Sequence, residues 1–256
     1  MKIEKYLSWR TSNLRKEDGI LVGADITQEW FLPWWWDHFQ KHNQLPVAFV
    51  DFGLSFPMKE WCQKRGELIP LRIFSDFIKE KEEMDPLIIS ALEDEFGKHF
   101  WEFRTAWFKK PFAFLQSPFE RTIWIDIDCE IRGNIRPLFD LVDQKPGIAM
   151  AKDLCDSLGH YNRSIYNSGV TAFLHGVSLI IQWAKRCVEN NGAFRGDQEV
   201  FSQMIADENI LLREIPPEYN WSRCHKDQSH AVILHWHGVY GKHAIRTQMN
   251  VEELSY

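Results

Sequence analysis

The amino-acid sequence predicts an α/β protein in which helices cover both faces of a mostly parallel central sheet. Short apolar runs of strand length recur through the 256 residues, and stretches with helical periodicity separate most of them. Polar residues follow several of these runs directly. Alternation of this kind is typical of strand–helix–strand units. The carboxyl ends of parallel strands share one crevice, where ligands bind.

The first part of the chain predicts a strand–helix–strand unit and a third strand. Residues 19–24 and 47–50 are apolar runs that indicate strands, and the aromatic amphipathic stretch 30–42 between them indicates a helix. A second helix is expected over 57–65 and a third strand over 67–73.

The middle of the chain leads to a buried strand that ends in acidic residues. The lysine- and glutamate-rich residues 79–83 indicate a solvated loop or helix face. Residues 86–116 predict a helix in two or more pieces, interrupted near Pro111, because proline lacks the N–H that a helix interior needs. The apolar run that follows ends at Asp126.

The last part of the chain continues the alternation. Strands are expected over residues 147–151, 168–173 and 231–234. A helix is predicted over 177–189, and another should begin near Asp197, since an acidic residue suits the positive end of a helix.

Length and composition limit the classes of protein that are possible. The chain is long enough for one large α/β domain, and no linker divides it, so we expect a single domain over residues 1–256. The net charge of -6 and the scattered basic residues argue against a nucleic-acid partner. No apolar segment approaches the length of about 18 residues that a membrane span needs. We therefore expect a soluble, cytoplasmic protein without a transmembrane segment. Five cysteines without a C-x-x-C pattern indicate reduced thiols.

Asp126 and Asp128 stand two residues apart at the end of the apolar strand. Side chains at i and i+2 of a strand point to the same side, so these carboxylates would lie about 6 to 7 Å apart. At an effective dielectric near 20, their repulsion is about 2 to 3 kcal/mol, which a bound divalent cation would relieve. By itself, an Asp-x-Asp sequence also fits a solvated turn.

Polar residues from distant parts of the chain could join this pair at one sheet edge. The residues at predicted strand ends are Asp25, Asp126, Asp128, Asp153 and His235. Two carboxylates and an imidazole suit Mn²⁺ or Mg²⁺ better than a structural zinc. Phosphate oxygens commonly fill the open positions of such ions, and Lys242 supplies positive charge for the same anion. The implied ligand is a diphosphate. Other phosphate-binding and hydrolase patterns, namely G-x-x-x-x-G-K-[ST], G-x-G-x-x-G, H-E-x-x-H and G-x-S-x-G, are absent from the sequence.

Four segments together resemble the GT-A nucleotide-sugar glycosyltransferases, particularly glycosyltransferase family 8. Residues 121–139 resemble the family's D-x-D segment, and 166–170 (YNSGV) resemble its N-[AS]-G-V strand. Residues 196–198 (GDQ) are similar to its D-Q helix start, and 235–238 (HWHG) to its H-x-x-G segment. The four occur in the family's order, a combination far more specific than any one motif. The resemblance covers most of the chain and implies the GT-A fold, a Rossmann-like nucleotide-diphospho-sugar transferase architecture.

The resemblance implies a role for each matched residue. Asp128 and His235 would be metal ligands, and Asp126 would contact both the metal and the ribose. Ala24 and Asp25 would lie against the nucleotide base. The remaining donor-binding positions would be Lys110 or its neighbour Lys109 at phosphate or sugar, Gly238 in the H-x-x-G segment, Lys242 over the diphosphate, and Asp153, Asn167, Asp197 and Gln198 around the donor sugar.

The implied activity is metal-dependent, retaining transfer of a hexose from a nucleoside diphosphate sugar, most simply a UDP-hexose, to a glycan, lipid or protein acceptor. The metal, Mn²⁺ or Mg²⁺, would stabilise the leaving diphosphate together with Lys242. Asp197 and Gln198 are candidates for stabilising the cationic sugar. A route by internal return is equally open, since the sequence shows no clear glycosidase-type nucleophile. Neither the acceptor nor the oligomeric state follows from the sequence.

Some features depart from the family or fit other interpretations. The family's tail reads H-x-x-G-x-x-K-P-W, whereas residues 235–243 (HWHGVYGKH) are one residue longer before the lysine and lack the Pro-Trp. The acceptor-binding or membrane-docking tail of some relatives is expected to be short or missing. A nucleotidyltransferase would usually carry a basic, glycine-rich loop after the first strand, where this chain has 23–28 (GADITQ). A catalytically silent sugar-binding relative is a further alternative. Packing explains the consecutive tryptophans 34–36 more simply than sugar binding does, and His237 and His243 are expected to be surface or packing residues.

Overall fold

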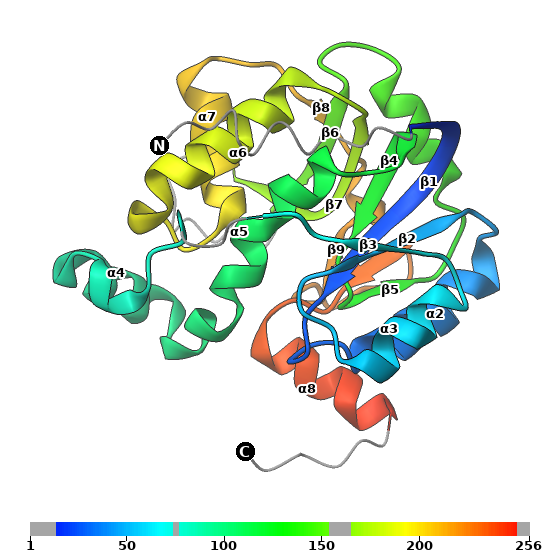
Figure 1. Cartoon of the computed structure of the whole chain (residues 1–256), viewed down its shortest axis with the longest axis horizontal. Coiled ribbons are helices and arrows are strands. Elements are labelled where there is room, and N and C mark those ends of the chain that lie inside the picture. The colour runs from blue at the N-terminus through cyan, green and yellow to red at the C-terminus, as the bar shows by residue number, and fades with distance from the viewer. Residues whose placement is uncertain (1–13, 74–76, 154–164, 250–256) are drawn as a thin grey trace.

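The computed structural model describes residues 14–73, 77–153 and 165–249. Within these residues the main sheet has the strand order β3-β2-β1-β4-β7-β6-β8 (Figure 1). Its strands are β1 (Arg15–Ala24), β2 (Val47–Asp51), β3 (Glu67–Pro70), β4 (Phe119–Ile125), β6 (Ile148–Lys152), β7 (Tyr166–Leu174) and β8 (Arg213–Glu214). Strand β7 is antiparallel to its neighbours β4 and β6, and the other pairs are parallel. The predicted mostly parallel sheet is confirmed.

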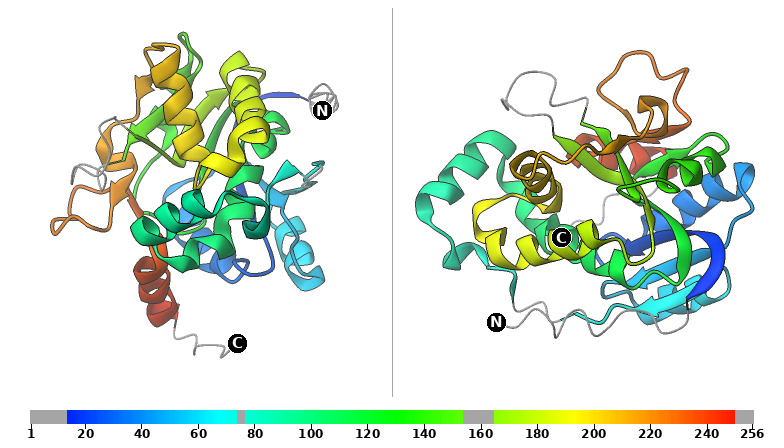
Figure 2. Two further views of the ribbon diagram at one scale, coloured as in Figure 1. Left: turned by 90° about the vertical axis from the view of Figure 1, so that its left-hand side faces the viewer. Right: turned by 90° about the horizontal axis from the view of Figure 1, so that it is seen from above.

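Side chains of the central strands alternate between two apolar cores, one on each face of the sheet. On β4, Ile123 and Ile125 enter one core, and Trp124 between them enters the other. The helices that contribute to the core with Trp124 are α5 (Trp101–Leu115), α6 (Ser178–Asn190) and α7 (Asp197–Asp207). Helices that contribute to the other core include α2 (Phe31–His42) and α3 (Phe56–Gln63) (Figures 1 and 2). Burial on both faces is the reason that these strands read as continuous apolar runs.

A second, smaller sheet places the C-terminal part of the chain beside the end of β4. It has the order β5-β10-β9. Its strands are β5 (Cys129–Ile131), β9 (Trp221–Ser222) and β10 (Ile233–His235). Strand β10 pairs antiparallel with β5, and His235 lies directly opposite Cys129. The helix α8 (Gly238–Met249) follows β10.

The remaining elements are short or peripheral. Helix α4 (Pro86–Phe96) extends from the edge of the molecule, next to the start of α5 (Figure 1). The 3₁₀ helices are η2 (Lys81–Glu83), η3 (Lys98–Phe100), η4 (Arg136–Val142), η6 (Asn191–Ala193) and η7 (Pro217–Tyr219). No helix in the described parts of the chain is both long and apolar enough to cross a membrane.

Two predictions about these elements are wrong. Helix α5 continues through Pro111, and the break within 86–116 lies instead at Gly97, which has a φ of 72°. Proline lacks one N–H donor, but its φ is helical. Pro111 is buried, and its packing maintains the helix. The expected strand over 231–234 is β10, which belongs to the small sheet, so that His235 is its last residue. Five elements, β5, β8, β9, η4 and α8, have no counterpart among the predicted elements, and most of them are too short to show a period.

Candidate active site

A cleft of about 900 Å³ opens at the edge of the main sheet where the parallel strands end. The predicted site residues that line it are Lys110, Asp126, Asp128, Asp153, Asn167, Asp197, Gln198, His235, Gly238 and Lys242. They come from α5, the turn after β4, the ends of β6 and β7, the start of α7, β10 and α8. The volume is in the range of small-molecule sites, about 300 to 1,000 Å³. Four of the five strand-end residues thus converge here, together with six residues that the family resemblance implied.

Asp126 is held in place at the floor of the cleft. Its backbone N–H donates to the carbonyl of Gly169 at 2.8 Å. Its carboxylate accepts from Trp124 Nε1 at 2.6 Å, and Lys110 Nζ lies 3.0 Å from Oδ1 and 3.1 Å from Oδ2. Trp124 and Asp126 share the side of the chain that faces α5, as alternation along β4 requires.

Asp128 is not placed by strand alternation, which corrects the geometry expected for the acidic pair. Strand β4 ends at Ile125 and the chain turns, with the Cys129 N–H donating to the Asp126 carbonyl at 3.1 Å. Lys242 Nζ lies 2.9 Å from Asp128 Oδ2. Burial favours the neutral acid, but Lys242 and His235 outweigh it and hold the pKa of Asp128 well below its ordinary value. Each carboxylate of the pair thus has its own lysine.

The tautomer of His235 follows from a chain of hydrogen bonds that starts at a backbone amide. The Gly169 N–H can only donate, so the side-chain atom of Asn167 that meets it at 2.9 Å is an oxygen. The same oxygen accepts from Asn220 Nδ2 at 3.0 Å, which leaves Asn220 Oδ1 to face His235 Nδ1 at 2.9 Å. Nδ1 therefore carries a proton, and the lone pair of the neutral ring is on Nε2.

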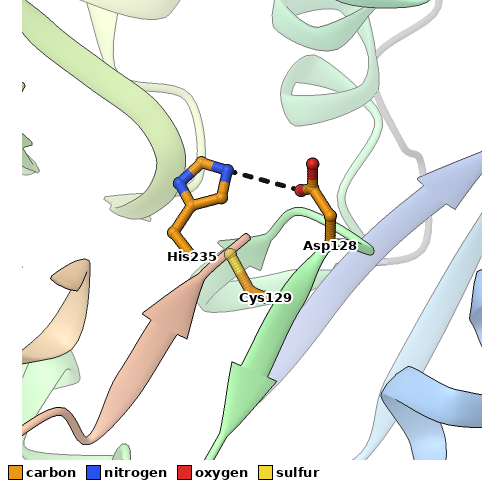
Figure 3. A group of neighbouring side chains, drawn as sticks. All are labelled: Asp128, Cys129 and His235. Atoms are coloured by element: carbon orange, nitrogen blue, oxygen red, sulfur yellow. Dashed lines mark ion pairs between the residues drawn. The ribbon is translucent and has the colours of Figure 1, made fainter. Parts of the chain in front are cut away.

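In the neutral ring, the Nε2 lone pair of His235 points at a carboxylate oxygen of Asp128, whereas in the protonated ring Nε2 carries a proton that can pair with this oxygen. Nε2 lies 3.3 Å from Asp128 Oδ1, and Figure 3 shows the two side chains directed toward each other. Two acceptors at this distance need a proton or a cation between them. An octahedral ion with bonds of about 2.1 Å spaces neighbouring ligands about 3 Å apart, so this pair fits a divalent ion. Carboxylate and imidazole together suit Mn²⁺.

Cys129 joins this pair and was not predicted as a site residue. Among the described residues, one potential ligand atom each from Asp128, Cys129 and His235 lies within 4.8 Å of the others. Asp126 is outside this group. Burial, with Asp128 and Asp126 nearby, raises the pKa of the Cys129 thiol well above its ordinary value. A protonated thiol is a poor metal ligand.

Lys110 and Asp197 form a second buried charged group on the α5 side of the cleft. Lys110 Nζ donates to Ser168 Oγ at 3.0 Å. Burial disfavours its ammonium, but Asp126 and Asp197 outweigh this effect and raise the pKa of Lys110. Burial raises the pKa of Asp197 to about 6, against the opposing effect of Lys110. Oδ2 of Asp197 is buried and has no hydrogen-bond partner among the described residues.

Asp153, Asn167 and Gln198 form a polar wall beside this group. Asp153 Oδ2 accepts from Asn167 Nδ2 at 3.2 Å and from Gln198 Nε2 at 3.4 Å. Asn167 can reach the cleft because β7 runs antiparallel to the strands beside it, so that its first residues lie where theirs end. Asp153 directly follows β6 at the same edge.

Gly169 is required by the close approach of His235. A Cβ atom at position 169 would lie 2.3 Å from Cε1 of His235 and 2.7 Å from Nδ1. Because real contacts are never this short, a side chain here would displace the imidazole. The glycine of the N-[AS]-G-V segment is thus explained by packing against His235.

Helix α8 supplies the positive charge above the floor. Gly238 begins the helix, and Lys242, one turn further on, pairs with Asp128. The Lys242 ammonium also lies 5.4 Å from the ring centroid of Phe31 and 5.1 Å from that of Phe103. The aromatic faces favour a cation in this position.

Two predicted site residues, Ala24 and Asp25, are not among those that line the cleft. Ala24 is buried at the end of β1. Asp25 Oδ1 accepts from the backbone N–H groups of Thr27 at 2.9 Å and Gln28 at 3.2 Å, as a turn residue does. Of the two lysines on α5, Lys109 donates to the Phe52 carbonyl at 3.2 Å, and Lys110 faces the cleft.

Several other residues have positions that sequence patterns did not specify. Asn220 lies in an irregular segment before β9 and gives no local signal, although it fixes the His235 ring. His237 lines the cleft, with its Nε2 2.7 Å from Ser222 Oγ; burial and then His235 lower the pKa of His237 to about 4. His243 is exposed on α8. The tryptophans at 34–36 pack in or against the apolar core, which confirms the packing interpretation.

Comparison with solved structures supports the fold that the site residues indicated. An active-site mutant of LgtC matches with a TM-score of 0.60 at 11% identity, over 93% of this chain and 98% of that one. Mouse xyloside xylosyltransferase 1 matches with a TM-score of 0.56 at 14% identity, over 86% and 97%. The glycosyltransferase GlyE of Streptococcus pneumoniae matches with a TM-score of 0.57 at 14% identity, over 88% of this chain and 55% of GlyE. No protein-family model and no curated protein matches the sequence. The chain therefore has a GT-A-like fold similar to that of glycosyltransferases.

Proposed function

We propose that this GT-A-like protein is a metal-dependent, retaining glycosyltransferase that moves a hexose from a nucleoside diphosphate sugar to an acceptor. One observation carries the proposal. Nε2 of His235 lies 3.3 Å from Asp128 Oδ1, with Nδ1 turned toward Asn220, in a cleft that also holds the lysines Lys110 and Lys242. A cation site flanked by two ammonium groups suits a ligand with several negative charges, as a diphosphate has.

Asp128 and His235 would hold the metal, and Mn²⁺ or Mg²⁺ fits their chemistry. When bound, such an ion would offset the negative charge that develops on the leaving diphosphate. Asp126 would approach both the metal and the ribose. Asn220 keeps the Nε2 lone pair of His235 directed at the metal position, since it binds the proton on Nδ1.

The two lysines would bind the diphosphate from opposite walls. Lys110 reaches the floor from α5, and Lys242 reaches it from α8. Each ammonium group already forms an ion pair with a carboxylate. On binding, the diphosphate would take the place of that carboxylate as the anionic partner of the lysine. Ala24 and Asp25 end β1, the strand next to β4 in the sheet, and we propose that the base, most simply uracil, lies there.

The donor sugar would lie against the polar wall. Asp153, Asn167 and Gln198 offer carboxylate and amide groups for sugar hydroxyls. Ionised Asp197 would stabilise positive charge that develops at the anomeric carbon as the diphosphate leaves. Its buried Oδ2, which has no hydrogen-bond partner among the described residues, could accept a sugar hydroxyl.

A panel of nucleotide sugars tests the proposal. Purified protein with Mn²⁺ is incubated with UDP- and GDP-sugars, and release of nucleoside diphosphate is measured with and without EDTA. We expect slow hydrolysis of at least one donor, stopped by EDTA, and proton NMR of the released sugar should show the donor's anomeric configuration first. Absence of both binding and hydrolysis across the panel would contradict the proposal. Release of the opposite anomer would contradict retention alone.

A further inference from the structure

One wall of the cleft is aromatic, and its tryptophan, Trp107, has no role in the proposed donor site. Phe100, at the end of η3, and Phe103, Trp107 and Lys110 on α5 all line the cleft, and their spacing of three or four residues places them on one stripe. Phe103 and Trp107 are half-buried, with ring centroids 6.3 Å apart. At a rise of about 1.5 Å per residue, Trp107 lies about 4.5 Å and Phe103 about 10 Å along the helix from Lys110. The stripe therefore runs from Lys110 past Trp107 to Phe103, whose ring centroid lies 5.1 Å from the Lys242 ammonium.

Trp107 is fixed next to the donor-sugar residues. A Cβ atom on Gly196 would lie 3.1 Å from Cε3 of Trp107, closer than most real contacts. Gly196 has a φ of -154°, which any residue adopts, so it is the indole that favours glycine here. Gly196 immediately precedes Asp197. The Trp107 ring thus borders the proposed position of the donor sugar.

Polar and charged groups surround these rings. The Arg195 guanidinium lies 5.8 Å from the centroid of Trp107 and pairs with Glu199. Asp94 lines the cleft near the outer end of the stripe, and Tyr240, which is 80% exposed, lines it from the start of α8. A sugar ring has an apolar C–H face that stacks on aromatic rings and a rim of hydroxyls that bond to charged groups. An acyl chain would instead cover the Arg195–Glu199 ion pair with apolar surface, which removes water from both charges.

We propose that Trp107 forms the acceptor subsite, and that the acceptor is a saccharide whose ring stacks on this indole. This inference rests on the proposed function, because it takes the Lys110 end of the cleft as the donor site. It selects a glycan from the three acceptor classes that the sequence left open. The acceptor hydroxyl would enter between Trp107 and the donor sugar beside Asp197.

The test separates the two proposals by measuring acceptor and donor behaviour independently. Saturation-transfer NMR with methyl pyranosides and disaccharides is recorded with UDP and diamagnetic Mg²⁺. The variants are Trp107→Leu, which removes the ring, Trp107→Phe, which keeps an aromatic face, and the control Trp61→Leu on α3, outside the cleft. UDP binding and donor hydrolysis are also measured for each variant. In hydrolysis the acceptor is water, which does not need to stack on Trp107.

We expect saturation transfer to at least one saccharide in the wild type, with affinity lowered about tenfold in Trp107→Leu, as loss of a stacked ring predicts. The saccharide affinity of Trp107→Phe should lie between those of Trp107→Leu and the wild type, and that of Trp61→Leu should match the wild type. UDP binding and donor hydrolysis should change less than about twofold in all three, since only acceptor binding is altered. The inference is overturned if the wild type binds no saccharide, or if Trp107→Leu binds saccharides as well as the wild type does. Transfer of the sugar only to an alkyl phosphate or a peptide would also overturn it. Failure of UDP binding with Trp107-dependent saccharide binding intact overturns the proposed function instead.

Discussion

A single backbone amide determines which nitrogen of His235 can bind a metal. The Gly169 N–H fixes the orientation of Asn167, which fixes that of Asn220, and Asn220 in turn holds the proton on Nδ1 of His235. Each side chain in this relay is at least partly buried, so water does not readily replace its partner. The imidazole is thereby oriented before any ligand arrives.

Loss of the Asn220 acceptor should weaken metal binding. In Asn220→Leu, His235 Nδ1 has no oxygen to bind, so the ring can rotate or shift its proton to Nε2. Outer-shell substitutions of this kind typically cost about 10- to 100-fold in metal affinity. Calorimetric titration with Mn²⁺ should show this loss, whereas Asn220→Asp, which keeps the acceptor, should retain most of the affinity. Equal affinities for Asn220→Leu and the wild type would contradict the relay.

The Lys110 ammonium should be important for stability as well as binding. Lys110→Met leaves Asp126 and buried Asp197 without their shared cation. Removing one partner of a buried charge pair costs about 3 to 5 kcal/mol, and urea unfolding should show a loss near the lower end because Asp126 is partly exposed. Lys109→Met is the matched control on the same helix. It removes a hydrogen bond to the Phe52 carbonyl and should cost only about 1 kcal/mol.

The raised pKa of Asp197 predicts the acid limb of the pH profile. Burial moves this pKa from 3.8 to about 6, so the carboxylate gains its proton as the pH falls through 6. If ionised Asp197 stabilises the cationic sugar, kcat for donor hydrolysis should fall about tenfold per pH unit below that point. Asp197→Asn should have low activity and lack this limb. Nucleotide binding measured over the same pH range separates this effect from loss of the metal.

At the scale of elements, the site depends on two features of topology. The reversed direction of β7 brings the start of that strand to the carboxyl ends of its neighbours, and the small sheet brings β10 against β5. The start of helix α8 then lines the cleft and places Lys242 on Asp128. In the absence of a metal, this ammonium compensates the buried carboxylate.

The Lys242 contact predicts opposite effects on metal and nucleotide. In Lys242→Met, Mn²⁺ no longer competes with an ammonium for Asp128, so binding of Mn²⁺ alone should tighten several-fold. UDP binding at saturating Mn²⁺ should weaken about tenfold, because a charge-assisted hydrogen bond to the diphosphate is lost. Electron paramagnetic resonance of free Mn²⁺ and calorimetry with UDP measure the two quantities. Lys242→Arg keeps the charge and should change neither quantity greatly; weaker Mn²⁺ binding in Lys242→Met would contradict this account.

At the scale of the whole molecule, strand-length apolar runs and helical periods predicted the main sheet and the helices on its faces. The strand-end rule also brought Asp126, Asp128, Asp153 and His235 to one cleft, although not Asp25. The local sequence could not show that Asp128 lies in a turn, because residues 126–128 fit a strand end and a turn equally well. Nor could it place Cys129 opposite His235 or Asn220 behind it, since those contacts depend on the pairing of strands too short to leave a period. Pro111 was misjudged because tertiary packing overrode its local preference.

The central claim is that Asp128 and His235 hold a divalent metal that is needed to bind a nucleoside diphosphate. Its most direct test is calorimetric titration of UDP and GDP into the protein with Mn²⁺ and with EDTA. The variants are Asp128→Ala and His235→Ala, with Asp140→Ala as an exposed control carboxylate. The account predicts Mn²⁺-dependent binding in the wild type and Asp140→Ala, and none in the other two, with native circular dichroism in all. Binding that persists in EDTA, or in either site variant, would contradict it.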